Sequence, residues 1–117
     1  MDKLKLPDEL YRHETAEDGR TISICTMRQM VLHCIGMDGS SSQRHRPYTR
    51  HGKKYYRPWR NYFNTFADDA TWTKLCEHGY AAHGEISEKN GTFFWMTRKG
   101  LDWLGEQLGI TIYNEGK

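Results

Sequence analysis

The chain of 117 residues is short of aliphatic side chains and of proline. Leu, Ile, Val and Phe together account for only 19 residues, and there are three prolines. So small an aliphatic share is typical of disordered chains when it is combined with a high net charge. The formal net charge is only +2, however, and 4 Trp, 7 Tyr and 5 Met replace the missing aliphatics. We therefore expect one folded domain with a core rich in aromatic side chains.

Long apolar segments are also missing. No run of 18 apolar residues occurs in the sequence, which excludes a hydrophobic transmembrane helix. The first ten residues, MDKLKLPDEL, lack the apolar stretch that is typical of a secretory signal. These absences predict a cytoplasmic protein without a membrane partner.

Cysteine is scarce, with Cys25, Cys34 and Cys76 as the three examples. An odd number of cysteines without a secretory signal fits a reducing compartment rather than a disulfide scaffold. Zinc is an alternative, because His78 lies close to Cys76 and His33 adjoins Cys34. No CxxC or HxxxH spacing occurs, however, and structural zinc sites usually show one. We expect buried free thiols, no metal and no cofactor.

Acidic residues are absent from Ser40 to Ala67, and basic residues are concentrated there. The seven basic residues of this segment are Arg44, Arg46, Arg50, Lys53, Lys54, Arg57 and Arg60. The rest of the chain holds ten basic and fifteen acidic residues, so the segment carries +7 and the remainder −5. This asymmetry predicts a basic binding element on an acidic body.

Local patterns predict most of the regular elements. Alternating apolar residues predict a strand at Thr21–Cys25, and a capping box of Thr26 and Gln29 predicts a helix that ends at Gly36. Its inward stripe comprises Met27, Met30, Val31, Cys34 and Ile35. Residues 38–58 are expected to form a long loop or a short β-ribbon with HGKKYY at its tip. Residues 59–66 are expected to form one helical turn.

The second half of the chain has clearer boundaries. Asp68 or Asp69 is expected to cap a helix ending at Gly79, with Trp72, Leu75 and Cys76 facing inward. The expected elements that follow are strands at Tyr80–Ile86 and Thr92–Thr97 around Asn90-Gly91, a helix over 98–108 between Thr97 and Gly109, and a strand at Ile110–Tyr113. Both faces of the second of these strands are apolar, which indicates burial on two sides or dimerisation through this hairpin.

This order of elements, from Thr26 to Gly109, resembles a winged-helix domain. The stretch LCEHGYAAHGEI followed by TFFWMTRKGLDWL carries most of the likeness. Small phage and prophage proteins of unknown function are similar, with a helix ending like HCIGMD, a segment like PWRNYF and a helix headed by two aspartates. The resemblance implies an α+β fold with three main helices, a two-stranded wing and a long basic loop. It also implies a mobile-element accessory protein in the cytoplasm of a bacterial host.

The resemblance divides the chain into three parts. These are an N-terminal arm and short strand over 1–25, a core over 26–109 that includes the basic loop 38–58, and a C-terminal strand or tail over 110–117. The helix before the wing would be the recognition helix. With Asp68, Asp69 and Glu77 against Lys74 alone, it is a poor surface for entering a DNA groove.

The basic-aromatic segment is therefore the candidate site. Its basic residues could neutralise phosphates, and Tyr48 and its other aromatic residues could stack on bases. The predicted binding residues are Arg44, Arg46, Arg50, Lys53, Lys54, Tyr55, Tyr56, Arg57, Trp59 and Arg60. Three interpretations remain open, namely contact with nucleic acid or a nucleoprotein complex, contact with an acidic protein, and a solvated loop whose aromatics pack inward.

Catalysis is not expected. No P-loop, GxSxG or HExxH motif occurs, although His45 and His51 flank the basic segment and leave a metal-dependent nuclease as an alternative. We predict a non-enzymatic protein that binds nucleic acid. The alternative from another class is a protein-binding inhibitor of a host defence system, similar to an anti-CRISPR, that acts through its acidic surface or exposed aromatics such as Trp103. A homodimer is compatible with either function.

Overall fold

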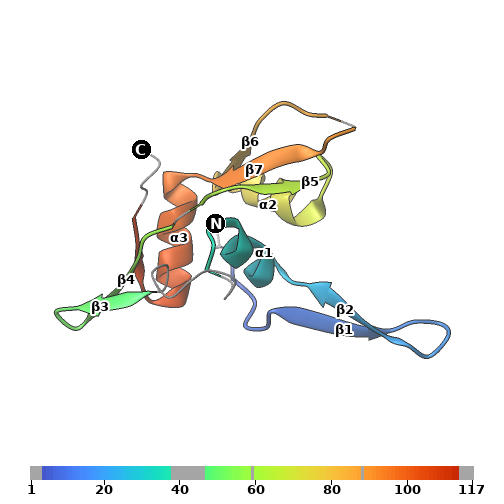
Figure 1. Ribbon diagram of the computed structural model, residues 1–117, viewed down its shortest axis with the longest axis horizontal. Coiled ribbons are helices and arrows are strands. Elements are labelled where there is room, and N and C mark those ends of the chain that lie inside the picture. Colours follow the sequence, from blue (N-terminus) through green and yellow to red (C-terminus); the bar gives the residue numbers. More distant parts are fainter. Residues whose placement is uncertain (1–3, 38–46, 59, 88, 114–117) are drawn as a thin grey trace.

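A computed structural model describes residues 4–37, 47–58, 60–87 and 89–113. These residues form an α+β protein with three helices and eight strands, which confirms the expected fold class at this level (Figure 1). The helices are α1 (Met27–Cys34), α2 (Ala70–Glu77) and α3 (Arg98–Leu108). The strands are β1 (Tyr11–Thr15), β2 (Thr21–Cys25), β3 (Tyr48–Arg50), β4 (Lys53–Tyr56), β5 (Phe63–Thr65), β6 (Ala81–His83), β7 (Thr92–Met96) and β8 (Thr111–Ile112).

The strands make three small sheets, ordered β1-β2, β3-β4-β8 and β5-β7-β6. The β1–β2 and β3–β4 hairpins extend from opposite sides of the central body (Figure 1). A winged-helix arrangement is not evident in the described residues. Between β5 and β6 the chain forms one helix, α2, so the two-helix unit that precedes the wing in such domains is lacking. The described part of segment 38–58 forms the β3–β4 hairpin, which confirms the β-ribbon alternative over the long loop, and β8 joins the same sheet.

The core is rich in aromatic side chains, as the composition predicts. Trp72 is fully buried and stacks on Phe94, with ring centroids 5.5 Å apart. Tyr80 and Trp103 stack at 4.6 Å. The indole N–H of Trp103 donates to the carbonyl of Leu4 at 2.7 Å, so the N-terminal segment covers this tryptophan. Large aromatic rings thus supply the buried area that the scarce aliphatics cannot.

Two of the three predicted helix caps form. The Asp69 carboxylate accepts from the N–H of Trp72 at 3.1 Å, and the Thr97 hydroxyl accepts from the N–H of Gly100 at 3.0 Å. The capping box at Thr26 is wrong, because Thr26 makes no side-chain cap hydrogen bond. Its hydroxyl donates instead to carbonyls of the incoming chain, including that of Leu10 at 3.1 Å. The chain that enters β1 holds these carbonyls within hydrogen-bond distance of the hydroxyl.

The expectations for two other segments are wrong. The N-terminal arm was expected to contain one short strand, at Thr21–Cys25, but it also contains β1, which pairs with β2 over five residues. The segment expected to form a helical turn contains β5, which pairs with β7. The side chain of Asn61 secures this arrangement, because its amide donates to the carbonyl of Met96 at 2.9 Å and accepts from its N–H at 2.8 Å. Tertiary pairing therefore overrides the local pattern.

The β6–β7 hairpin is present, but burial on both faces is wrong for β7. Phe94 and Met96 are buried, whereas Phe93 is 51% and Trp95 37% exposed. The sheet therefore covers the core with one face and presents aromatic side chains on the other. Within the described residues, no helix has both the length and the apolar character needed to cross a membrane.

Candidate nucleic-acid interface

The β3–β4 hairpin forms the centre of the predicted basic segment. Its tip is His51-Gly52, and the φ angles of these two residues are 54° and 79°. Positive φ at both central residues is typical of a type I′ turn, whose twist suits a tight hairpin. The predicted hairpin tip at HGKKYY is therefore confirmed. Residues 38–46 of the expected loop lie outside the described residues.

The C-terminal strand joins this hairpin. β8 pairs in parallel with β4, with Tyr55 beside Thr111 and Tyr56 beside Ile112. Tyr56 and Ile112 are buried, and the Tyr56 hydroxyl donates to the carbonyl of Ile35 at 3.0 Å. Side chains alternate between the two faces of a sheet. Tyr55 and Thr111 therefore lie on the opposite, outward face.

Three tyrosines form a row across the outward face. Tyr48 and Tyr55 are cross-strand partners whose rings stack at 5.7 Å, and Tyr55 stacks on Tyr113 at 5.8 Å. The guanidinium carbon of Arg57 lies 5.9 Å from the centre of the Tyr113 ring, within cation–π distance. Each strand of the sheet, or the residue just after it, thus supplies one ring.

Basic residues share this face with the tyrosines. Arg50 pairs with Lys53 at the end of the hairpin, and alternation places both on the side of Tyr48 and Tyr55. We name the resulting surface the Tyr–Arg face, which consists of Tyr48, Arg50, Lys53, Tyr55, Arg57 and Tyr113. No acidic residue occurs in β3, β4 or β8. The face therefore combines aromatic rings with basic side chains, on strands that carry no acidic residue.

The structure places other predicted site residues elsewhere. Tyr56 is a core residue, so the expectation that it stacks on a ligand is wrong. Lys54 alternates to the other side of β4, and together with Lys53 and Glu106 it lines an open groove of about 570 Å³ beside the end of α3. There the negative end of the helix dipole favours a cation. Arg60 donates from Nε to the carbonyl of His33 at 2.9 Å, at the end of α1. Arg44, Arg46 and Trp59 lie outside the described residues.

Tyr113 is the functional candidate that sequence reasoning missed. The alternation of Ile110–Tyr113 predicts a strand, and that strand is present as β8. Nothing in a single sequence indicates that it pairs with residues more than fifty positions earlier. The sequence signal for Tyr113 is therefore confined to its place in an alternating segment.

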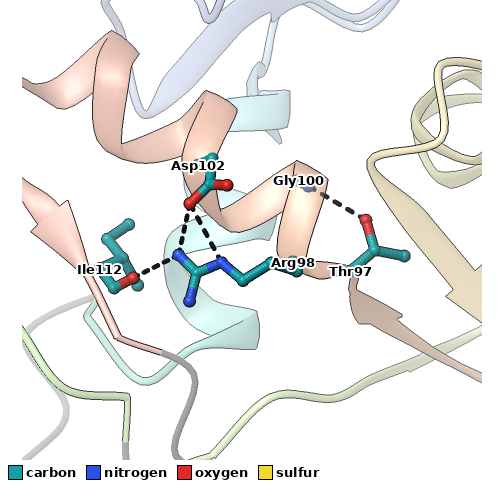
Figure 2. A network of polar contacts seen from close by, with 5 residues as sticks. All are labelled: Thr97, Arg98, Gly100, Asp102 and Ile112. Atoms are coloured by element: carbon teal, nitrogen blue, oxygen red, sulfur yellow. Dashed lines mark hydrogen bonds and ion pairs between the residues drawn. The ribbon is translucent and has the colours of Figure 1, made fainter.

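A polar network holds β8 in position (Figure 2). The Arg98 side chain donates to Asp102 Oδ1 from two nitrogens, at 3.0 and 2.6 Å, and to the carbonyl of Ile112 at 2.5 Å. The N–H of Tyr113 in turn donates to the carbonyl of Tyr56 at 3.0 Å. The first turn of α3 therefore supports the strand that carries Tyr113.

Burial favours the protonated thiol at two of the three cysteines, Cys34 and Cys76. Cys34 is fully buried, and its thiol donates to the Asn61 side chain at 3.3 Å. Burial raises the pKa of Cys34 to about 12, despite a lowering by the Met96 backbone and the Arg60 charge. Burial also raises the pKa of Cys76. Thiolates are the form that binds metals, and the described residues contain no group of three His, Cys, Asp or Glu side chains that could hold a metal ion.

A sheet face with stacked rings and guanidinium groups can contact bases and neutralise phosphates at once. Comparison with known proteins adds no assignment, because no family model, no curated protein and no solved structure matches this chain.

Proposed function

We propose that this protein binds nucleic acid, without catalysing a reaction, through the Tyr–Arg face. The observation that carries the proposal is the row of Tyr48, Tyr55 and Tyr113 on the same face as three basic side chains. Rings bind the π faces of bases, and the cations bind the phosphates between them. Asp69 at the N-cap of α2 and Asp68 just before it make that helix an unfavourable alternative.

Single strands are the expected form of the ligand. Stacking on a tyrosine requires an unpaired base, and it contributes about 1–3 kcal/mol per base in single-strand binding proteins. The exposed part of the row can be reached only by bases that are not enclosed in a duplex. We therefore expect a single strand to bind more tightly than a duplex of the same length.

The proposal is tested by fluorescence anisotropy with a labelled single strand of about 20 nucleotides and the matching duplex. Tyr55→Ala should weaken single-strand binding by roughly 1–3 kcal/mol, because it removes the central ring of the row. Arg50→Ala combined with Lys53→Ala should weaken binding to both ligands. It should also reduce the salt slope by about 1.4 for the single strand, since each phosphate contact contributes about 0.7.

A matched control separates this face from general charge. The double variant Lys5→Ala and Lys74→Ala removes the same charge from exposed positions outside the Tyr–Arg face. It should leave the affinity and the salt slope almost unchanged. Equal losses of affinity in both double variants would show that net charge, and not the Tyr–Arg face, determines binding. No measurable binding of either ligand at low salt would refute the proposal.

A second function is favoured by a different surface. The outward face of the β5-β7-β6 sheet exposes Phe93 and Trp95, beside Tyr62 at the start of β5. Tyr62 packs edge-on against Phe93 with ring centroids 6.0 Å apart. Exposed aromatic side chains are frequent anchors of protein interfaces. They support protein binding, and we propose as the alternative function a protein-binding inhibitor of a host defence system.

The two functions give opposite results with the same variants. Under the second, affinity capture from a bacterial lysate returns one protein partner. Phe93→Ala combined with Trp95→Ala abolishes that capture, whereas the Arg50 and Lys53 double variant retains it. Under nucleic-acid binding, the Arg50 and Lys53 double variant loses affinity for the labelled strand in the anisotropy measurement, whereas the Phe93 and Trp95 double variant keeps it.

A further inference from the structure

The β1–β2 hairpin projects from the body and is covered by little else (Figure 1). All five residues of β1 are exposed, and large apolar side chains are among the exposed residues of the hairpin, with Tyr11 at 43% and Ile22 at 44%. An isolated two-stranded hairpin is marginally stable in water. A sheet of this size gains stability when further strands extend it.

The outer edge of β1 offers backbone groups for such an extension. The N–H of Thr26 donates to the carbonyl of Leu10, and that of Ala16 to the carbonyl of Arg20. In an antiparallel ladder the hydrogen-bonded pairs alternate, so the even-numbered residues of β1 direct their backbone groups to β2. Tyr11, His13 and Thr15 direct theirs outward. Within the described residues, β2 is the one strand that pairs with β1.

This edge lacks a bulge, lysine and proline, three features that prevent strand pairing. Natural edge strands are commonly interrupted by a bulge or protected by lysine or proline. The five residue pairs of β1 and β2 run without a bulge. The sequence of β1, YRHET, contains neither lysine nor proline. The edge is therefore open to an antiparallel strand of suitable charge.

We propose that two copies of this chain pair through β1, antiparallel and around a two-fold axis at His13. This register places Arg12 opposite Glu14 of the second copy, and Glu14 opposite its Arg12. It also places Tyr11 opposite Thr15 and His13 opposite His13 of the second copy. The backbone groups of these residues point outward, so they can form the hydrogen bonds between the two copies. Arg12 and Glu14 of the second copy form a non-hydrogen-bonded pair, in which side chains approach most closely.

Charge selects this register over its neighbours. Moving the two-fold axis to residue 12 sets Arg12 opposite Arg12 of the second copy. Moving it to residue 14 sets Glu14 opposite Glu14 of the second copy. Like charges directly opposite one another destabilise a strand pair. Within one copy, Arg12 and Glu14 lie 3.3 Å apart and are largely exposed, so this contact alone adds little. The dimer would bring together four charges of alternating sign, those of Arg12 and Glu14 from each copy.

Apolar neighbours strengthen the expected ion pairs. Arg12 is the cross-strand partner of Ile24, and Glu14 that of Ile22. In the four-stranded sheet of the dimer, these isoleucines flank each ion pair on the same face. Partial removal of water increases the attraction between the charges. The contact is self-complementary, as a two-fold interface requires.

A charge exchange tests the pairing in the full chain. Arg12→Glu makes the edge acidic, Glu14→Arg makes it basic, and each variant should dimerise roughly tenfold or more weakly than the original chain. An equimolar mixture of the two variants should dimerise again, because each acidic edge meets a basic one. Sedimentation equilibrium measures all four samples. A monomeric original chain, undiminished dimerisation of the single variants, or no recovery in the mixture would overturn the proposal.

Disulfide formation tests the register itself. With Cys25→Ser as background, His13→Cys should crosslink two copies under mild oxidation, because this position meets itself at the axis and directly opposed residues lie within disulfide distance. Tyr11→Cys alone is the matched control and should crosslink much less, since Thr15 of the second copy lies opposite it. Equal crosslinking at positions 11 and 13 would overturn the register.

Discussion

At the scale of single residues, the close approach of α3 to the chain before β6 depends on Gly100. A Cβ atom at this position would lie 1.8 Å from the backbone carbonyl oxygen of Tyr80. Alanine normally stabilises a helix interior by about 1 kcal/mol over glycine. Here the obstacle is backbone, which cannot turn aside as a flexible side chain can. The close packing on Tyr80 therefore requires glycine at position 100, although glycine has a low helix propensity.

We expect Gly100→Ala to lower the free energy of unfolding by roughly 2–4 kcal/mol, because α3 must move away from Tyr80. Urea unfolding followed by tryptophan fluorescence measures the change. Thr73→Ala on the exposed side of α2 is the control, and it should alter stability by less than about 0.5 kcal/mol. A Gly100→Ala variant as stable as the original chain would show that the helix and the Tyr80 carbonyl separate without cost.

The Cys34 thiol links residue burial to alkaline stability. Its pKa in the folded protein is raised from 9.0 to about 12. Between these values the unfolded chain releases the proton and the folded chain keeps it. Stability is therefore fully present below pH 9 and falls as the pH rises toward 12.

We expect Cys34→Ala to lose less stability than the original chain between pH 8 and pH 10.5, although it starts from a lower value because of the cavity. The difference between the two slopes isolates the contribution of the Cys34 thiol. Thiol labelling at pH 8 provides a second measurement. Exposed Cys25 should react quickly, and Cys34 only on unfolding. Parallel slopes for the two chains would contradict the assignment to Cys34.

At the scale of elements, the helices and the sheets differ in how far the sequence predicts them. The three helices follow from periodic apolar residues and local signals such as Asp69, Thr97 and Gly109. The strands of two hairpins also follow from local alternation and turn residues. The pairing of β4 with β8 does not, because it joins segments that are distant in sequence and depends on the completed core.

The candidate site was predictable to the same extent. Charge and aromatic content identify the segment, and the hairpin places Arg50, Lys53, Tyr55 and Arg57 on one face. The burial of Tyr56 could not be separated from the exposure of Tyr55 without the strand register. One residue of displacement exchanges the two faces of a strand. Tyr113 joins the site only through the parallel pairing of β8 with β4, which the sequence does not predict.

The support of β8 by Arg98 gives a prediction for this element. Arg98→Ala removes the hydrogen bond to the Ile112 carbonyl and the partly exposed ion pair with Asp102. We expect global stability to fall by only about 1 kcal/mol, because the ion pair is screened by solvent. The N–H of Tyr113 should exchange with deuterium faster, whereas amides in the middle of α3 keep their protection.

Arg20→Ala is the control for that measurement. It removes an ion pair with Asp18 in the turn between β1 and β2, far along the chain from β8. The exchange of the Tyr113 amide should then stay unchanged. If Arg98→Ala has no effect on this amide, β8 is held by β4 and the core alone. Single-strand affinity should fall together with the protection of Tyr113, because that residue completes the tyrosine row.

At the scale of the whole molecule, the small net charge conceals a separation of charge. The segment from Ser40 to Ala67 carries +7 and the remainder −5. The described basic residues of this segment lie largely on the hairpin that extends from one side of the body (Figure 1). The β1–β2 hairpin extends from the opposite side. A dimer formed through β1 would therefore keep both Tyr–Arg faces away from the shared edge.

This arrangement predicts that the β1–β2 hairpin can be shortened without loss of the fold. Replacing residues 13–23 by Asn-Gly closes the Arg12–Ile24 pair with a turn suited to a two-residue hairpin. The removed residues are mostly exposed and belong to none of the core contacts. We expect the free energy of unfolding of the monomer to change by less than about 1 kcal/mol. Urea unfolding at low protein concentration measures it.

The same variant should lose dimerisation while single-strand binding by each copy persists. Sedimentation equilibrium and fluorescence anisotropy on one preparation separate these outcomes. A large fall in monomer stability would show that the hairpin belongs to the cooperative folding unit, and a retained dimer would move the interface elsewhere, with the exposed Phe93 and Trp95 face as the next surface to alter. Because the turn keeps the contact of Leu10 with Thr26, the N-terminal segment still reaches Trp103. Any loss is then due to the removed strands themselves.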